Sequence, residues 1–160
     1  MAFSELEKIL KETAIKYKVF MTLATNSLKI GFYKDDPKKA DSYLWIDPAW
    51  RITKNNVNVL NSFNYPYHEN YEDEDREKEK QDFLKWANSA DDLQKNLKLT
   101  DLQISSKGDL SIQFQEHYDL DVFVNDVVEY GWYFRDIVED LIYEVSIGKI
   151  AERKSETEEA

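Results

Sequence analysis

The stretch Leu28-Lys29-Ile30-Gly31-Phe32 decides the fold, because its pattern returns later in the chain as Leu110-Ser111-Ile112-Gln113-Phe114. Side chains two residues apart lie on one face of a β-strand, so each stretch predicts a strand with one buried face. Both copies continue with a second alternating run and end in an aromatic segment that contains arginine: Tyr43 to Ile46 and Trp50-Arg51 in the first copy, Asp119 to Phe123 and Trp132 to Arg135 in the second. The sequence therefore predicts two related units of antiparallel strands.

The other strands follow from the same signals, apolar alternation and turn residues between the runs. Thr25-Asn26-Ser27 and Ser106-Lys107-Gly108-Asp109 are predicted turns, and Pro48 ends pairing because proline lacks the N–H that a ladder needs. The expected strands cover residues 19–24, 28–33, 42–46, 50–53, 57–60, 101–104, 110–114, 120–124, 130–136 and 141–147.

Helical periodicity marks two segments. Residues 4–17 form the first, with Ser4 as its cap, and residues 76–87 form the second, whose acidic start suits the helix dipole. A further short helix is expected from Ser89. The side chains expected to face the sheet are Phe3, Leu6, Ile9 and Leu10 in the first helix, Phe83, Leu84 and Ala87 in the second, and Leu93 and Leu97 in the third.

These elements predict the α+β class. An antiparallel sheet is built from two related meander units, and an N-terminal helix and a middle helical segment pack on one of its faces. The chain has 160 residues, which is enough for one domain with its own core. We expect a single domain over residues 1–150, followed by a charged, disordered tail over 151–160.

Composition limits the classes of function. The net charge of −11 disfavours binding to nucleic acid and to anionic membranes, because both attract cations. It suits either a basic protein partner or simple solubility. The sequence has no cysteine, no apolar run long enough to span a bilayer and no secretory signal at its start, so we expect a cytoplasmic protein.

Residues that could carry chemistry are few. His68 and His117 are the only histidines, and neither has a second ligand at a metal-binding spacing. The chain contains four glycines and no phosphate-binding loop, and no serine lies in a nucleophile elbow. We therefore predict no catalytic residue, no metal and no cofactor, hence a protein that is not an enzyme.

Two groups of residues are candidates for binding a partner. The first is an acidic stretch with tyrosines, which supply contact area at low entropic cost; its members are Tyr65, Tyr67, Tyr71, Glu72, Asp73, Glu74 and Asp75. The second is the pair Arg51 and Arg135, since arginine beside aromatic rings is frequent at interfaces. The alternatives are a solvated acidic surface and, for the arginines, pairing with acids of the same chain while Trp50 and Trp132 fill the core.

The order of these motifs resembles a family of small bacterial proteins of the kind found as immunity proteins of polymorphic toxin systems. The segments that carry the resemblance are Ile30-Gly31-Phe32, Leu44 to Arg51, Gly108 to Phe114, Leu120 to Phe123 and Glu129 to Phe134. The resemblance implies a binding protein that neutralises a basic toxin domain by occluding it. The alternatives are an adaptor domain, or a ligand-binding or enzyme module whose pocket between the two units gathers Arg51, Arg135 and carboxylates. The oligomeric state is left open.

Overall fold

The structure is a computed structural model that describes residues 1–64, 71–94, 98–124 and 131–154. In these ranges the chain forms two α-helices, eleven strands and short 3₁₀ helices. The helices and strands are α1 (Phe3–Lys16), β1 (Lys18–Ala24), β2 (Ser27–Tyr33), β3 (Ser42–Ile46), β4 (Trp50–Lys54), β5 (Val57–Asn61), α2 (Arg76–Gln94), β6 (Leu99–Ile104), β7 (Leu110–Phe114), β8 (Tyr118–Val122), β9 (Trp132–Asp136), β10 (Leu141–Ser146) and β11 (Lys149–Lys154).

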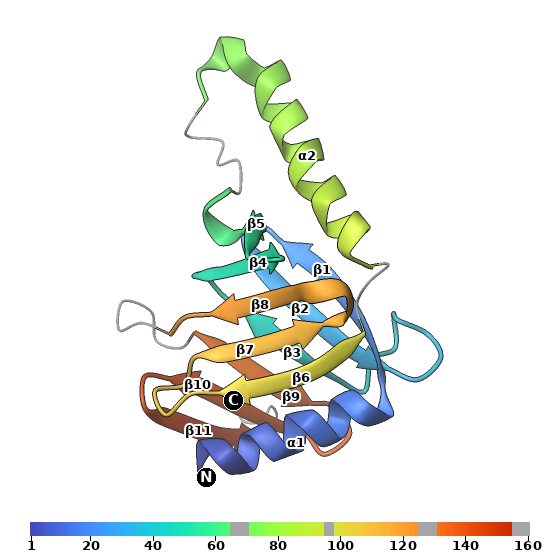
Figure 1. The fold of residues 1–160 in the computed structure, drawn as a ribbon, viewed down its shortest axis with the longest axis vertical. Helices are drawn as coiled ribbons and strands as arrows, with labels where there is room; N and C mark the ends of the chain where they lie inside the picture. Colours follow the sequence, from blue (N-terminus) through green and yellow to red (C-terminus); the bar gives the residue numbers. More distant parts are fainter. Residues whose placement is uncertain (65–70, 95–97, 125–130, 155–160) are drawn as a thin grey trace.

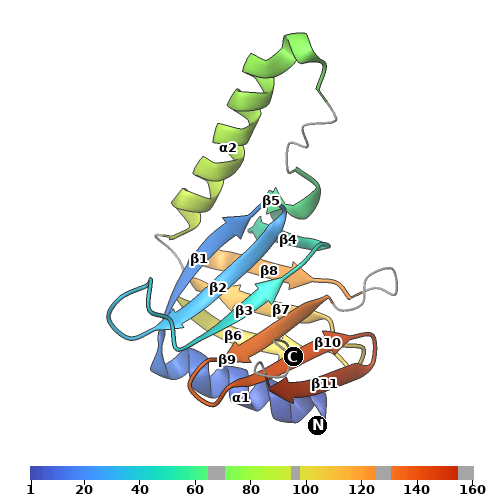
Figure 2. The ribbon, with the colours of Figure 1, turned by 180° about the vertical axis from the view of Figure 1, so that it is seen from behind.

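The strands form two antiparallel sheets stacked face to face (Figures 1 and 2). We call the six-stranded sheet, of order β1-β2-β3-β9-β10-β11, sheet A, and the five-stranded sheet, of order β5-β4-β8-β7-β6, sheet B. The α+β class, the antiparallel strands and the two helical regions are confirmed. The expected single sheet is in fact two, because each unit sends its strands into both.

The two predicted units are α1 to β5 and α2 to β11, which we call repeat 1 and repeat 2. Repeat 1 places its three-stranded meander β1-β2-β3 in sheet A and its hairpin β4-β5 in sheet B. Repeat 2 does the reverse, with the meander β6-β7-β8 in sheet B and β9-β10-β11 in sheet A. The repeats are therefore related by a pseudo-two-fold axis that exchanges the sheets, and among the described strands β11 has no counterpart.

The crossings between the sheets are held by equivalent backbone hydrogen bonds. After β3, the N–H of Asp47 donates to the carbonyl of Gly131, directly before β9, over 3.0 Å. After β8, the N–H of Phe123 donates to the carbonyl of Ala49, directly before β4, over 2.9 Å. Each repeat thus fixes the point at which the other repeat changes sheets, which ties the two into one unit.

The two buried tryptophans are equivalent as well. The indole N–H of Trp50 donates to the carbonyl of Asn26, and that of Trp132 donates to the carbonyl of Gly108, each over 2.8 Å. Each tryptophan lies 24 residues after its acceptor, which belongs to the first turn of the same repeat. A buried tryptophan needs such a partner for its N–H. The interpretation that Trp50 and Trp132 fill the core is confirmed.

The core lies between the sheets and follows the alternation of the strands. The prediction that the two apolar trios face this core is confirmed, since all six side chains are at most 4 % exposed: Leu28, Ile30 and Phe32 of β2, and Leu110, Ile112 and Phe114 of β7. Burial of such side chains is the main stabilising contribution to the fold.

The helices lie at opposite ends of the sandwich instead of on one common face, which corrects the expected packing. α1 packs along β6, the edge of sheet B, whereas α2 packs against β1, the edge of sheet A, and against β5. This arrangement obeys the pseudo-two-fold, because each helix meets the first strand of the other repeat. Each helix thereby covers an edge strand that would otherwise present unpaired backbone groups.

The middle helical segment differs from its prediction in two respects. It is one helix from Arg76 to Gln94, since neither glycine nor proline interrupts the sequence around Ser89. Phe83 and Leu84 are 47 % and 49 % exposed, because this part of α2 projects beyond the sandwich (Figure 1). Trp86 is buried, as is the correctly predicted Leu93. The side chain of Ala87 and all of Leu97 lie outside the described residues.

The expected end of the fold at residue 150 is wrong. β11 continues to Lys154 and pairs with β10, and the hairpin turns through Gly148, which has a φ of 67°. Arg153 donates to the carboxylate of Glu144 over 2.9 Å. The charged sequence of β11 suits an edge strand, which has one partner and little apolar surface to bury. Residues 155–160 of the predicted tail lie outside the described residues.

Candidate functional site

Exposed apolar side chains concentrate at the end of the sandwich that carries α2. The described ranges expose twelve large apolar side chains, and five of them belong to three elements: Val57 and Val59 of β5, Phe63 of the 3₁₀ helix η1 (Ser62–Asn64), and Phe83 and Leu84 of α2. Phe63 is the most exposed of the five, at 75 %. We call these five residues the apolar set. The sequence does not reveal this set, because the residues of β5 alternate like those of any half-buried strand.

The predicted acidic residues lie at the start of the same helix. Glu72 to Asp75 are all exposed, and the last three form the 3₁₀ helix η3 (Asp73–Asp75), which leads directly into α2. None of the ion pairs found within the described residues includes them. Four adjacent carboxylates that no described lysine or arginine pairs with favour an external positive charge.

Tyr71 connects this acidic stretch to the helix. Its hydroxyl donates to the Asp82 carboxylate over 2.7 Å. This hydrogen bond is the largest cause that raises the pKa of Tyr71 to about 12, and desolvation of the hydroxyl and the negative charges of Asp82 and Glu79 contribute the rest. The bond connects the segment that precedes α2 to the side of that helix. The other two tyrosines of the predicted stretch, Tyr65 and Tyr67, lie outside the described residues.

Arg135 lies far from the acidic stretch, on the outer face of sheet A. Its guanidinium donates to the Tyr43 hydroxyl over 3.4 Å, and the pairing of β3 with β9 places these two residues opposite each other. The same pairing places Trp45 opposite Tyr133, and their rings stack with centroids 6.4 Å apart. Lys29 lies over the Tyr43 ring at 4.5 Å. Arg135 therefore belongs to an aromatic cluster in the centre of this sheet face.

Arg51 lies on the outer face of sheet B and is not the equivalent of Arg135. When the two buried tryptophans are aligned, Arg51 corresponds to Tyr133 of repeat 2. In sheet B, Arg51 lies opposite Asp121. Arg51 pairs with Asp121 over 3.4 Å and stacks on Phe123. The matching arginine finish expected for the two units is therefore wrong, since only the tryptophans correspond. Pairing with an acid of the same chain is what the structure shows for Arg51.

A pocket does exist between the repeats, in a different place from the one expected. It has a volume of about 780 Å³ and lies among the end of α1, the starts of β1 and β6, and the ends of β2 and β7. Neither Arg51 nor Arg135 lines it. The arrangement that would have favoured an arginine-based enzyme site is therefore not formed by this pocket.

Within the described ranges, no group of three or more histidine, cysteine, aspartate or glutamate side chains is placed to hold a metal ion. His117 is exposed, and His68 lies outside those ranges. In the part of the chain that the structure describes, no helix is both long and apolar enough to cross a membrane.

Comparison of the chain with protein-family models, with curated proteins and with solved structures finds no match. The family resemblance therefore stays a prediction.

Proposed function

We propose that this chain is a non-enzymatic binding protein that engages a basic protein partner through the α2 end of the sandwich. The observation that carries the proposal is the combination of the apolar set with the exposed carboxylates of Glu72 to Asp75 on neighbouring elements. Protein interfaces commonly join an apolar centre to a polar rim. Here the apolar set would supply the contact area, and the acidic stretch would supply the charge that selects the partner.

Charge and exposed apolar area would act on different steps of binding. Opposite charges steer the encounter, so the acidic stretch should raise the association rate. Desolvated apolar contacts hold a complex together, so Phe83 and Leu84 should lower the dissociation rate. Since α2 projects from the sandwich, a partner can reach both groups without displacing the core (Figure 2).

The resemblance to immunity proteins makes a secreted toxin domain the partner that we propose. An immunity protein needs tight binding and no chemistry of its own, because covering the active surface of a toxin is sufficient to inactivate it. Binding of this kind would take place in the cytoplasm of the producing cell. No nucleic acid or membrane takes part in the proposed function.

The proposal is tested by co-expressing the chain with the product of the adjacent gene and measuring association and dissociation rates of the complex. Neutralising the acidic stretch (Glu72→Gln, Asp73→Asn, Glu74→Gln and Asp75→Asn together) should slow association about tenfold at low salt and less at high salt. Phe83→Ala with Leu84→Ala should instead accelerate dissociation.

A matched control separates the effect of the acidic stretch from the effect of the net charge of the chain. Four exposed acids elsewhere, changed together, alter the net charge by the same amount: Glu12→Gln, Asp35→Asn, Glu116→Gln and Glu139→Gln. This control should leave association close to that of the unmodified chain. Equal effects of the two sets, or an adjacent gene that does not encode a toxin, would contradict the proposal and favour an adaptor domain.

A further inference from the structure

The pocket between the repeats is separate from the proposed interface at the α2 end, because none of the interface residues lines it. Its volume of about 780 Å³ lies within the range of roughly 300–1,000 Å³ that is usual for small-molecule sites. It is partly open to solvent. The described residues around it therefore have room for an organic molecule, and their chemistry indicates which kind.

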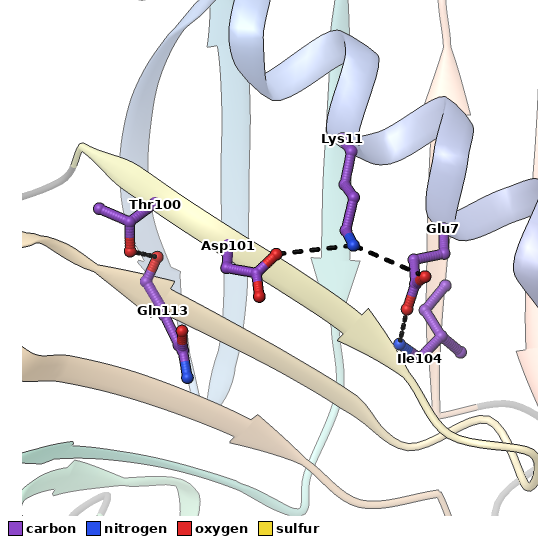
Figure 3. A network of polar contacts seen from close by, with 6 residues as sticks. All are labelled: Glu7, Lys11, Thr100, Asp101, Ile104 and Gln113. Carbon is purple, nitrogen blue, oxygen red and sulfur yellow. Dashed lines mark hydrogen bonds and ion pairs between the residues drawn. The ribbon is translucent and has the colours of Figure 1, made fainter.

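One wall of the pocket is α1, which is fixed along β6 by a polar network (Figure 3). The Glu7 carboxylate accepts a hydrogen bond of 2.8 Å from the backbone N–H of Ile104. Lys11 lies between two carboxylates, 3.7 Å from Glu7 and 3.5 Å from Asp101. These contacts hold the helix against the edge strand, so the pocket does not depend on a ligand to form its wall. The positive charge of Lys11 is therefore already paired with carboxylates of the protein.

The opposite walls come from equivalent positions of the two repeats. Lys18 pairs with Tyr33 at the start of the β1–β2 ladder, and the N–H of Gln115 donates to the Lys98 carbonyl at the start of the β6–β7 ladder. Both pairs line the pocket. Lys18 and Lys98 are therefore structural counterparts, and the pocket lies across the pseudo-two-fold axis with one lysine from each repeat.

Lys18 and Lys98 also differ from Lys11 in their surroundings. Both are exposed, and no ion pair found within the described residues includes either of them. In a chain with a net charge of −11, two such ammonium groups beside one cavity form a local positive region. A positive region of this kind attracts an anion.

The rest of the lining is largely apolar or aromatic. Ala14 of α1, Val19 of β1 and Leu99 of β6 contribute aliphatic surface, and Tyr17 and Tyr33 contribute rings. All five are partly buried, so the apolar body of a ligand would remove further area of theirs from water. The pocket thus combines apolar surface with two ammonium groups. A purely apolar ligand would leave these ammonium groups without an ionic partner.

We propose that this pocket binds an amphipathic anion, whose carboxylate or phosphate headgroup is held by Lys18 and Lys98 and whose aliphatic body lies against Val19, Leu99 and the two tyrosines. The ammonium groups supply charge-assisted hydrogen bonds to the headgroup, and the apolar surface supplies the affinity for the chain. This binding is independent of the proposed protein partner.

The test uses calorimetric titration of the full chain with octanoate, octyl phosphate and octan-1-ol. The first two differ in the headgroup that they offer, and the third has the same chain length without charge. At least one anion should bind with one molecule per chain, and about tenfold more tightly than the alcohol, because an ionised hydrogen-bond partner contributes more than a neutral one.

Two variants examine the site itself. Lys18→Gln with Lys98→Gln should weaken binding of the anion about tenfold, while the control pair Lys38→Gln with Lys149→Gln, which removes two exposed lysines elsewhere, should not. Ala14→Trp, which fills the cavity without changing charge, should abolish binding. Circular dichroism confirms that each variant is folded.

Four outcomes would overturn the proposal. They are no binding of either anion, binding of octan-1-ol as tight as that of the anions, equal loss of affinity in the two lysine pairs, and unchanged binding in a folded Ala14→Trp variant. None of these outcomes depends on whether the adjacent gene encodes a partner, so the pocket and the interface are judged separately.

Discussion

Replacing each of the two equivalent tryptophans with phenylalanine should destabilise the protein by unequal amounts. Both changes remove an indole N–H that donates over 2.8 Å to a carbonyl in the first turn of its repeat. The environments of these bonds differ, however. The bond from Trp132 to Gly108 is buried, whereas the bond from Trp50 to Asn26 is partly open to solvent. The pseudo-symmetry thus supplies two nearly matched sites that differ in access to water.

The expected difference follows from what happens to the carbonyl left behind. Each substitution loses apolar contact worth about 1 kcal/mol. In Trp132→Phe the buried Gly108 carbonyl also loses its partner, which costs about 1–3 kcal/mol. In Trp50→Phe water can replace the lost donor at Asn26, so that this second cost is largely absent. We expect a loss of about 2–4 kcal/mol for Trp132→Phe and about 1–2 kcal/mol for Trp50→Phe.

Urea unfolding monitored by far-ultraviolet circular dichroism measures the difference, because that signal reports mainly the backbone and is present in both variants. The midpoint should fall further for Trp132→Phe while the slope of the transition stays unchanged in both variants. Equal losses, or a larger loss for Trp50→Phe, would refute the argument that burial of the acceptor carbonyl decides the cost.

Three further predictions concern α2 and metal binding. Phe83→Ala and Leu84→Ala should each change the free energy of unfolding by less than about 1 kcal/mol because both side chains are half-exposed, whereas Trp86→Ala should cost about 3–5 kcal/mol, as urea titrations will show. In an ultraviolet pH titration Tyr71 should ionise near pH 12, and Asp82→Asn should lower this pKa toward its usual value. Because the folded pKa is the higher one, the stabilisation from Tyr71 is complete below pH 10 and is lost as the pH rises from about 10 to 12. A chelator should leave the thermal midpoint unchanged, and a midpoint that falls and is restored by zinc would contradict this.

Most of the strands could be predicted from the sequence because alternation is a local property. Ile30 and Ile112 are buried for the same reason, and each is flanked at two-residue spacing by apolar side chains that share its face. Alternation does not say which sheet a strand joins, since that depends on pairing with residues far along the chain. The strands β3 and β9, for example, are neighbours although Ile46 and Trp132, which pair, are distant in the sequence.

The candidate site could be predicted only in part. The exposed carboxylates of Glu72 to Asp75 follow from composition, because adjacent acids are rarely buried. The exposure of Phe83 could not be predicted, because helical periodicity identifies an apolar side of a helix without showing how far the helix extends beyond its support. The pocket could not be predicted from the sequence either. Lys18 and Lys98 line the same cavity only because the two repeats exchange strands between the sheets.

The departures from pseudo-symmetry help to separate function from folding. Each repeat needs a helix that covers the first strand of the other repeat, and the 14 residues of α1 are sufficient for this. α2 has 19 residues, projects from the sandwich and is preceded by the acidic stretch. Since the equivalent helix covers its edge strand without these additions, the fold does not require them. Exposed apolar side chains on such an addition favour a binding role for α2. The pocket on the pseudo-two-fold axis, in contrast, is lined by equivalent positions of the two repeats.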